Sequence, residues 1–330
     1  MLFSEIRGHS RALQLLTRVM RTGRLAHAYL FSGPEGVGKA TVAREMTASL
    51  LCTDKSSLEP CGHCPGCRQY NSDNHPDFVH VRPDGVSIKI DQIRSLKKQL
   101  AFSPFAGGIR VILIEEAQTM RREAANSLLK LLEEPPPDNL FLLVASDAEP
   151  TLPTILSRCQ VVAFAPLADD IAAEIIGMHS PELDGRESLM LARLSGGCPG
   201  RGLTMDAGDV LPLRDQVVAV LFESRWAPPR AVEEALFLAR EMAGLNNGLD
   251  LLLDLLRLFF KDGLLGCLQP ESPVRDPGDD PKDPMFLRER WNLSQLSDKM
   301  RAIDAAGRAL ARNCNRALVC EVLMLRLIGS

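Results

Sequence analysis

The sequence predicts an α/β domain followed by helices only, and three observations support this prediction. Short apolar runs alternate with helical stretches across residues 25–167, a pattern typical of a parallel sheet with helices on both faces. The strongest of these runs are continuously apolar, as in strands that are buried on both sides. After residue 167, apolar residues recur at helical spacing. We therefore expect an α/β domain at residues 1–167, a small helical lid at 168–208 and an all-helical domain at 209–330.

Length and charge set broad limits on function. The 330 residues are enough for two or three domains with a large core. A net charge of −4 does not indicate a dedicated nucleic-acid binder, although residues 1–50 carry seven Lys or Arg against three Glu, a local charge of +4. That patch could face DNA, a nucleotide or a partner, but a solvated helix face is the more common explanation for any one of its residues. No apolar run approaches the length of a membrane span, so we expect a cytoplasmic protein without membrane contact.

Local signals define the elements of the first domain. A helix over residues 9–23 ends at a glycine, a helix over 90–100 has Asp91 in its first turn, and a helix over 119–134 stops at three consecutive prolines. The expected strands are residues 28–31, 77–81, 110–114, 139–146 and 160–164.

The C-terminal region is predicted to be helical. The expected helices are residues 211–223, 231–242, 249–265 and a final pair ending at Ile328. Residues 268–284 interrupt this pattern with five prolines and five acidic residues, which favours a flexible loop. The sequence leaves the role of that loop open.

A phosphate-binding loop is predicted between the first strand and the helix over residues 40–51. Residues 33–39 contain the complete spacing GxxxxGK, after an apolar run and before a helix. Lys39 supplies a positive charge for phosphate, and the helix N-terminus adds partial positive charge. The hydroxyl that should follow the lysine and ligate Mg²⁺ is missing, because Ala40 stands there and Thr41 is one position, about 100° of helix, further on. Three glycines allow backbone amides to surround phosphate: Gly33, Gly36 and Gly38. An ordinary glycine-rich turn is the alternative.

Two carboxylates follow the buried run at residues 110–114. In a phosphate-loop NTPase, acids at the carboxyl end of such a strand hold Mg²⁺ and orient the attacking water. Here they are Glu115 and Glu116. A glutamate in the first position is one methylene longer than the usual aspartate, which further weakens the predicted metal site.

Four cysteines predict a structural zinc site inserted at residues 52–67. They follow the spacing C-x8-C-x2-C-x2-C, and short C-x2-C steps allow thiolates to converge on one tetrahedral ion. The ligands are Cys52, Cys61, Cys64 and Cys67. Four thiolates close the coordination shell, so we expect no catalysis there. His63 could replace one ligand but is interpreted as a bystander, and free or redox-active thiols are the alternative.

The combination of these motifs with three further segments resembles the clamp loader of bacterial DNA polymerase III, a group of AAA+ proteins. The resemblance covers essentially the whole chain and is most specific over residues 25–167. It is carried by His27–Gly33, the phosphate loop, the four-cysteine insertion, Asn126–Pro136, Ile155–Cys159 and Asn313–Glu321.

Within that family, two branches share this architecture: the ATP-hydrolysing gamma/tau subunits and the delta-prime subunits. Ala40 and Glu115 depart from the gamma/tau pattern, so the delta-prime branch is the more similar. The resemblance implies a stator that works in DNA replication with gamma/tau and delta subunits to load the sliding clamp on primed DNA. It also implies a component of a DNA-directed DNA polymerase, a nucleotidyltransferase, with structural Zn²⁺, weak or absent ATP and Mg²⁺ binding, and no ATPase activity of its own. A gamma/tau-like active ATPase is the alternative; a zinc-based nucleic-acid binder fits poorly with the acidic net charge.

Two arginines take roles from the same resemblance. Arg158, in Ser157-Arg158-Cys159, is expected to act as an arginine finger that reaches the γ-phosphate of ATP held by a neighbouring subunit. A structural arginine paired with an acid is the alternative. Arg201 corresponds to the sensor 2 position, where an ordinary solvated arginine is equally plausible.

Overall fold

A computed structural model describes residues 3–106, 108–146, 153–223, 228–245, 248–268 and 290–329. The chain forms two compact units, Met1–Gly202 and Leu203–Ser330. Most of the predicted acidic loop, residues 269–284, lies outside the described residues. Within the described part of the chain, no helix combines the length and the apolar character needed to cross a bilayer.

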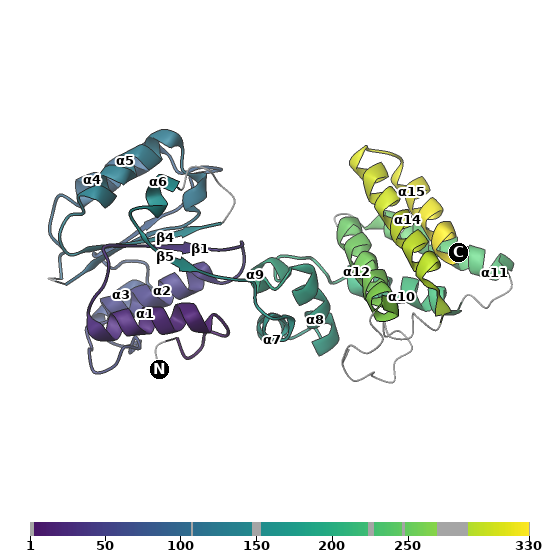
Figure 1. Cartoon of the computed structure of the whole chain (residues 1–330), viewed down its shortest axis with the longest axis horizontal. Helices are drawn as coiled ribbons and strands as arrows, with labels where there is room; N and C mark the ends of the chain where they lie inside the picture. The colour runs from purple at the N-terminus through teal and green to yellow at the C-terminus, as the bar shows by residue number, and fades with distance from the viewer. Residues whose placement is uncertain are drawn as a thin grey trace. The chain divides into compact units, whose positions relative to one another are not determined.

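A parallel five-stranded sheet forms the centre of the first unit (Figure 1), as the sequence predicts. The strand order is β2-β3-β4-β1-β5. All residues of β3 and β4 are buried, which explains why their sequences are continuously apolar. The strands are β1 (Ala28–Ser32), β2 (Phe78–Val81), β3 (Arg110–Ile114), β4 (Asn139–Ala145) and β5 (Gln160–Ala163).

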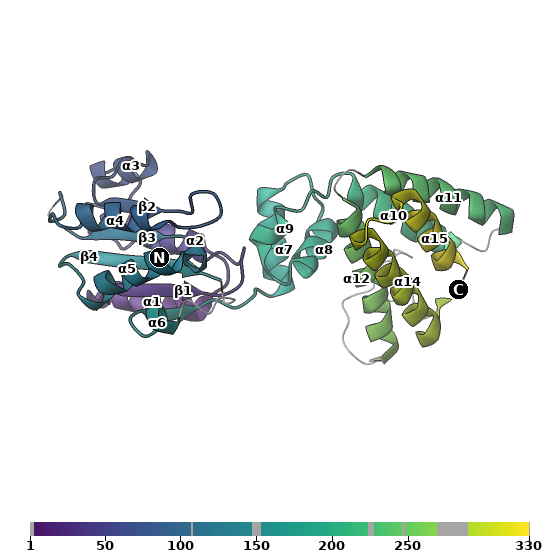
Figure 2. The same ribbon diagram turned by 90° about the horizontal axis from the view of Figure 1, so that it is seen from above.

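Helices cover both faces of this sheet (Figures 1 and 2). Side chains alternate between the faces along each strand, so Leu30 and Ile112 join one core whereas Phe31 and Leu113 join the other. The first core lies under α4 (Ile90–Gln99), α5 (Arg122–Glu133) and α6 (Pro153–Leu156). The second lies under α1 (Ser10–Thr22) and α2 (Lys39–Leu51), and α3 (Pro65–Asn71) packs beside α2.

Helix α5 begins three residues later than the sequence predicts. Residues 117–119 form a short 3₁₀ helix, η1, and Met120 is extended. The amide of Ile88 donates to Thr119 O at 3.2 Å, and the amide of Arg121 donates to Ile88 O at 3.2 Å. These two hydrogen bonds join residues 119–121 to Ile88 as an isolated β-bridge and hold Met120 in an extended conformation, so the helix can begin only after it.

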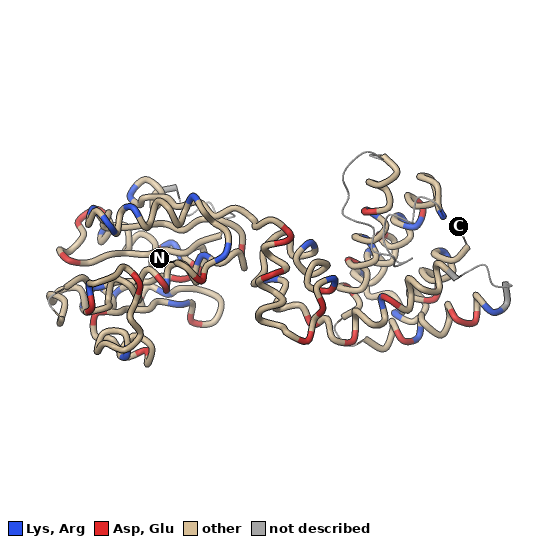
Figure 3. The backbone as a smooth tube through the Cα atoms, turned by 90° about the horizontal axis from the view of Figure 1, so that it is seen from below, with Lys and Arg blue, Asp and Glu red and all other residues tan. Residues whose placement is uncertain are grey.

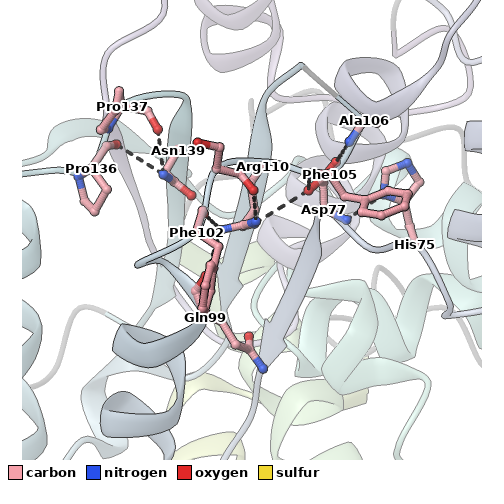
Figure 4. Close-up of polar contacts among 11 residues, drawn as sticks. His75, Asp77, Gln99, Phe102, Phe105, Ala106, Arg110, Pro136, Pro137 and Asn139 are labelled. Carbon is pink, nitrogen blue, oxygen red and sulfur yellow. Dashed lines mark hydrogen bonds and ion pairs between the residues drawn. The ribbon is translucent and has the colours of Figure 1, made fainter.

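Buried charges fix the loop between α4 and β3 (Figure 4). The carboxylate of Asp77, which is 1% exposed, accepts from the amides of Phe105 and Ala106 at 2.7 and 2.8 Å. Arg110 donates to Gln99 O at 3.1 Å and Phe102 O at 2.9 Å, and its Nε lies 3.7 Å from Asp77. Each buried charge therefore has partners, as burial requires.

The predicted lid helices complete the first unit. They are α7 (Asp169–His179), α8 (Gly185–Leu194) and α9 (Pro199–Gly202). The second unit is helical, as expected, and its core includes Phe259, Phe260 and Trp291. Among the described residues its helices are α10 (Val210–Glu223), α11 (Pro228–Gly244), α12 (Leu249–Leu268), α14 (Leu293–Ala311) and α15 (Arg316–Ile328). Acidic and basic residues are distributed along both units (Figure 3).

Candidate functional site

The phosphate loop joins β1 to α2 and encloses the lysine that the sequence singles out. Lys39 is only 6% exposed, and its Nζ donates to Gly33 O at 2.6 Å and Pro34 O at 2.7 Å. Gly36 and Gly38 have φ values of 76° and 111°, a region that favours glycine. The loop thus has the strand, glycine turn and helix arrangement of a phosphate site, with the ammonium group bound to its own carbonyls.

The lid helix α9 contacts this loop directly. The amide of Gly200 donates to Gly36 O at 2.8 Å. A Cβ on Gly36 would lie 2.5 Å from the amide nitrogen and 2.8 Å from Cγ of Arg201. The backbone and Cγ of Arg201 therefore lie beside the loop, and its sensor 2 role stays a prediction.

His9 is a residue of this site that the sequence analysis missed. It precedes α1 with a left-handed backbone, φ 53°, and its Nε2 lies 2.9 Å from Val37 O in the phosphate loop. Since a carbonyl only accepts, Nε2 carries the proton in this contact. Burial, with the nearby Lys39, outweighs the hydrogen bond to Val37 and lowers the pKa of His9. The only signal in the sequence is a Gly8-His9 pair before a helix, which does not indicate contact with a loop 28 residues away.

Glu115, the first predicted acid, is bound by basic side chains. Its Oε1 accepts from Nη2 of Arg44 at 2.7 Å and lies 3.3 Å from Nε2 of His80, and its Oε2 lies 3.4 Å from Nε of Arg82. Burial disfavours the charged form, but hydrogen bonds from His80 and Arg44 outweigh it and lower the pKa of Glu115 to about 2. The carboxylate is thus ionised and already paired with the guanidinium groups of Arg44 and Arg82. Arg44 belongs to the basic patch noted in residues 1–50, but neither it nor His80 or Arg82 was assigned to this site from the sequence.

The other two residues of the predicted metal site, Thr41 and Glu116, are exposed. Thr41 is exposed and lines a cavity of about 480 Å³ together with Arg44, His80 and Tyr70. Glu116 is exposed with a left-handed backbone, φ 52°, and its carbonyl accepts from the amide of Thr119. This sparsely populated conformation marks the end of β3 as a strained turn, which is common at functional sites.

Arg158 lies at the end of α6 and folds back onto its own unit. Its Nη2 donates to Oε1 of Glu133 at 2.5 Å, and its Nη1 donates to Thr154 O and Ser157 Oγ, both at 2.9 Å. The side chains of Arg158 and Glu133 are 33% and 48% exposed. This is the ion pair that the alternative interpretation of Arg158 requires. Glu133, from the end of α5, is a further site residue that the sequence analysis did not identify.

The four cysteines converge as the spacing predicts. One sulfur from each lies within 4.8 Å of the others, and the sulfurs of Cys52 and Cys64 are 3.8 Å apart. Zinc–sulfur bonds of about 2.3 Å at tetrahedral angles require a separation of roughly 3.8 Å between sulfurs. The amides of Thr53 and Cys67 donate to the Cys64 sulfur at 3.4 and 3.3 Å. Burial disfavours the Cys64 thiolate, but these hydrogen bonds outweigh it and lower the pKa to about 5. Burial raises the pKa of Cys67 to about 12, so the fit to Zn²⁺ rests on the convergence of the four sulfurs.

The sheet, the phosphate loop after β1, the acids after β3 and the helical lid together define a protein of the AAA+ class. A family model described as "DNA polymerase III, delta subunit" matches residues 8–168. A DNA polymerase III delta-prime subunit from Bacillus subtilis is 32% identical over 265 residues, 77% of this chain and 76% of the relative. The chain belongs to the family of DNA polymerase III delta-prime subunits.

Other comparisons extend to both branches of clamp-loader subunits. The delta-prime subunit of Pseudomonas aeruginosa is 37% identical over 196 residues, 58% of this chain and 60% of the relative. The tau subunit of Escherichia coli is 33% identical over 219 residues, 66% of this chain and 33% of the relative. A gamma subunit-related protein from Thermotoga maritima is similar in structure with a TM-score of 0.39 and 19% identity, covering 95% of this chain and 98% of that protein.

Proposed function

We propose that this chain is the stator of a clamp loader, a component of the DNA polymerase III holoenzyme that does not hydrolyse ATP itself. The observation that carries this proposal is the pairing of Glu115 with Arg44, His80 and Arg82. A carboxylate that already neutralises cations is a poor ligand for Mg²⁺. The missing hydroxyl at Ala40 and the exposed position of Thr41 weaken the metal site further.

Arg158 is proposed to contact the γ-phosphate of ATP that is bound by a neighbouring subunit. Its guanidinium is partly exposed and now pairs with Glu133, so a triphosphate on a neighbour would have to replace that carboxylate. An exposed ion pair contributes only about 0.2–1 kcal/mol, whereas guanidinium binds phosphate oxygens through strong charge-assisted hydrogen bonds. The exchange is therefore energetically feasible. The proposed partners are gamma/tau and delta subunits, and through them the sliding clamp and primed DNA.

The four cysteines are proposed to hold one structural Zn²⁺. All four protein ligands are thiols, so the shell is closed and leaves no position for a reacting water. The module follows α2 directly, because Cys52 is the C-cap of that helix. Bound zinc would tie the end of α2 to α3.

Titration with ATP distinguishes this proposal from an active ATPase of the gamma/tau type. The alternative is favoured by the complete GxxxxGK loop and by the position of Arg201 beside it. We expect the isolated chain to bind labelled ATP weakly or not at all, with no increase on adding Mg²⁺, and not to hydrolyse it. Stoichiometric Mg²⁺-dependent binding, or hydrolysis that Lys39→Ala abolishes, would refute the stator proposal.

Arg158→Ala tests the arginine finger. We expect the folded variant to assemble into the loader but to reduce ATP hydrolysis at the neighbouring site by up to about 10³-fold, the lower value for arginine fingers in GTPases. The measurement is DNA-stimulated ATP turnover by the reconstituted complex. Glu133→Gln is the matched control: it removes the same ion pair, keeps the guanidinium and should retain turnover. Equal ATP turnover by complexes that contain Arg158→Ala and by complexes that contain the unaltered chain would exclude a role of Arg158 in hydrolysis.

A further inference from the structure

We propose that the cysteine module binds a second divalent metal ion on Asp54, Cys61 and His63, with the Cys61 thiolate bridging both ions. One ligand atom from each of these residues lies within 4.8 Å of the other two. Cys61 also belongs to the four-cysteine set, so the two candidate sites share a single sulfur. The proposal concerns Zn²⁺, since one sulfur, one nitrogen and one oxygen ligand suit this borderline-soft ion.

The hydrogen bond of His63 prepares its ring as a ligand. Nδ1 lies 2.7 Å from Cys61 O. Because a carbonyl oxygen only accepts, Nδ1 carries the proton and Nε2 of the neutral ring keeps a free lone pair. Histidines that bind metals typically donate their other ring N–H to a carbonyl or carboxylate in this way. The contact therefore leaves Nε2 as the ring nitrogen with a lone pair for a metal ion.

Asp54 and Cys61 complete the set from the exposed side of the module. Oδ1 of Asp54 accepts from the amide of Ser56 at 2.9 Å, which orients the carboxylate. Cys61 is partly exposed, whereas the other three cysteines are buried. A thiolate has enough lone pairs for two ions, and Cys61 is the ligand whose remaining lone pairs can face outward. Three protein ligands would leave one open position, unlike the closed four-cysteine shell.

Metal stoichiometry tests this proposal on the full chain. The protein is dialysed to equilibrium against buffered Zn²⁺, and zinc and protein are then quantified. We expect two zinc ions per chain, released in two phases by a chelator, with the faster phase from the exposed site. Asp54→Asn and His63→Ala should each lower the stoichiometry to one and remove only the fast phase. Circular dichroism confirms that each variant is folded.

His179→Ala is the matched control. His179 is exposed and its Nδ1 lies 2.9 Å from Ile175 O, the same type of contact as in His63, but it belongs to no candidate metal cluster among the described residues. This variant should keep two zinc ions. The proposal would be overturned by a stoichiometry of one zinc ion per unaltered chain. It would also be overturned if Asp54→Asn and His63→Ala both kept two zinc ions per chain. Loss of both ions from folded His63→Ala would also overturn it, because His63 would then belong to the first site.

Discussion

Glu115 is the residue at which local chemistry bears most strongly on function. Three basic side chains from α2 and from the end of β2 approach it within 2.7–3.4 Å. Arg44 follows Lys39 by five positions in the helix that begins at the phosphate loop, so the site contains its own counter-charge for the acid. This pairing supports the proposal that Glu115 is a poor ligand for Mg²⁺ in this chain.

Acid unfolding should reveal this pairing. The pKa of Glu115 is lowered from 4.5 to about 2 in the folded chain, so between these values the unfolded state binds more protons. The stabilisation is complete above pH 4.5 and is lost as the pH falls towards 2. We expect Glu115→Gln to lower the unfolding free energy at pH 7 by about 1 kcal/mol and to make the loss of stability below pH 4.5 smaller. Urea unfolding at several pH values measures both effects, and an unchanged acid dependence in the variant would contradict the assignment.

At the scale of elements, the phosphate loop and α9 are in direct backbone contact. Gly36 has no room for a Cβ, since one would lie 2.5 Å from the amide nitrogen of Arg201. Gly85 has a similar φ, 72° against 76°, but a Cβ there would meet no atom within 4 Å. A comparison of substitutions at these two glycines therefore separates the steric overlap of a Cβ with α9 from the strain of a side chain at positive φ.

Alanine at these two positions tests the contact. Both variants introduce a side chain at positive φ, which costs roughly 1 kcal/mol. We expect Gly36→Ala to lower the melting temperature clearly more than Gly85→Ala, because α9 must also move. Thermal unfolding followed by circular dichroism measures the difference. Equal decreases in melting temperature would mean that α9 can move away from residue 36 without a loss of stability.

At the scale of the whole molecule, the chain consists of two units, and the cysteine module belongs to the first. The predicted boundaries at residues 167 and 208 differ from this division, since the lid helices lie within Met1–Gly202. The division of the chain into three separate domains at these boundaries remains a prediction. A structural zinc ion should therefore support one unit and not the other.

Removal of zinc should affect only the first unit. We expect Cys61→Ser, or a strong chelator, to lower the unfolding temperature of the sheet-containing unit, because metal binding contributes to folding. The helical unit should unfold as before. Cys314→Ser, at an exposed cysteine of the second unit, is the matched control. Calorimetry, with limited proteolysis to assign each transition, provides the measurement; identical unfolding with and without the chelator would exclude a structural role for zinc.

Much of the fold could be predicted because its signals are local. Continuous apolar runs marked the strands to within one residue at most ends, and prolines after residue 134 marked the end of α5. The start of α5 was wrong because pairing of Thr119 and Arg121 with Ile88 overrides helical spacing. Such pairing depends on a segment about 30 residues away and leaves no trace in the local pattern.

The sequence by itself determined the phosphate-loop spacing, the four-cysteine set and the alternation of strands with helices. Each depends on residues close together in the chain, where glycine conformation, ligand spacing and side-chain periodicity act directly. Only the tertiary structure decided that Glu115 pairs with Arg44, that Arg158 contacts Glu133 and that His9 contacts Val37. These contacts join residues 25–71 positions apart. Glu115 and Val37 follow strands and lie at the carboxyl edge of the parallel sheet, whereas Arg158 and Glu133 precede β5 and β4 at its amino edge, so only the folded sheet brings each pair together.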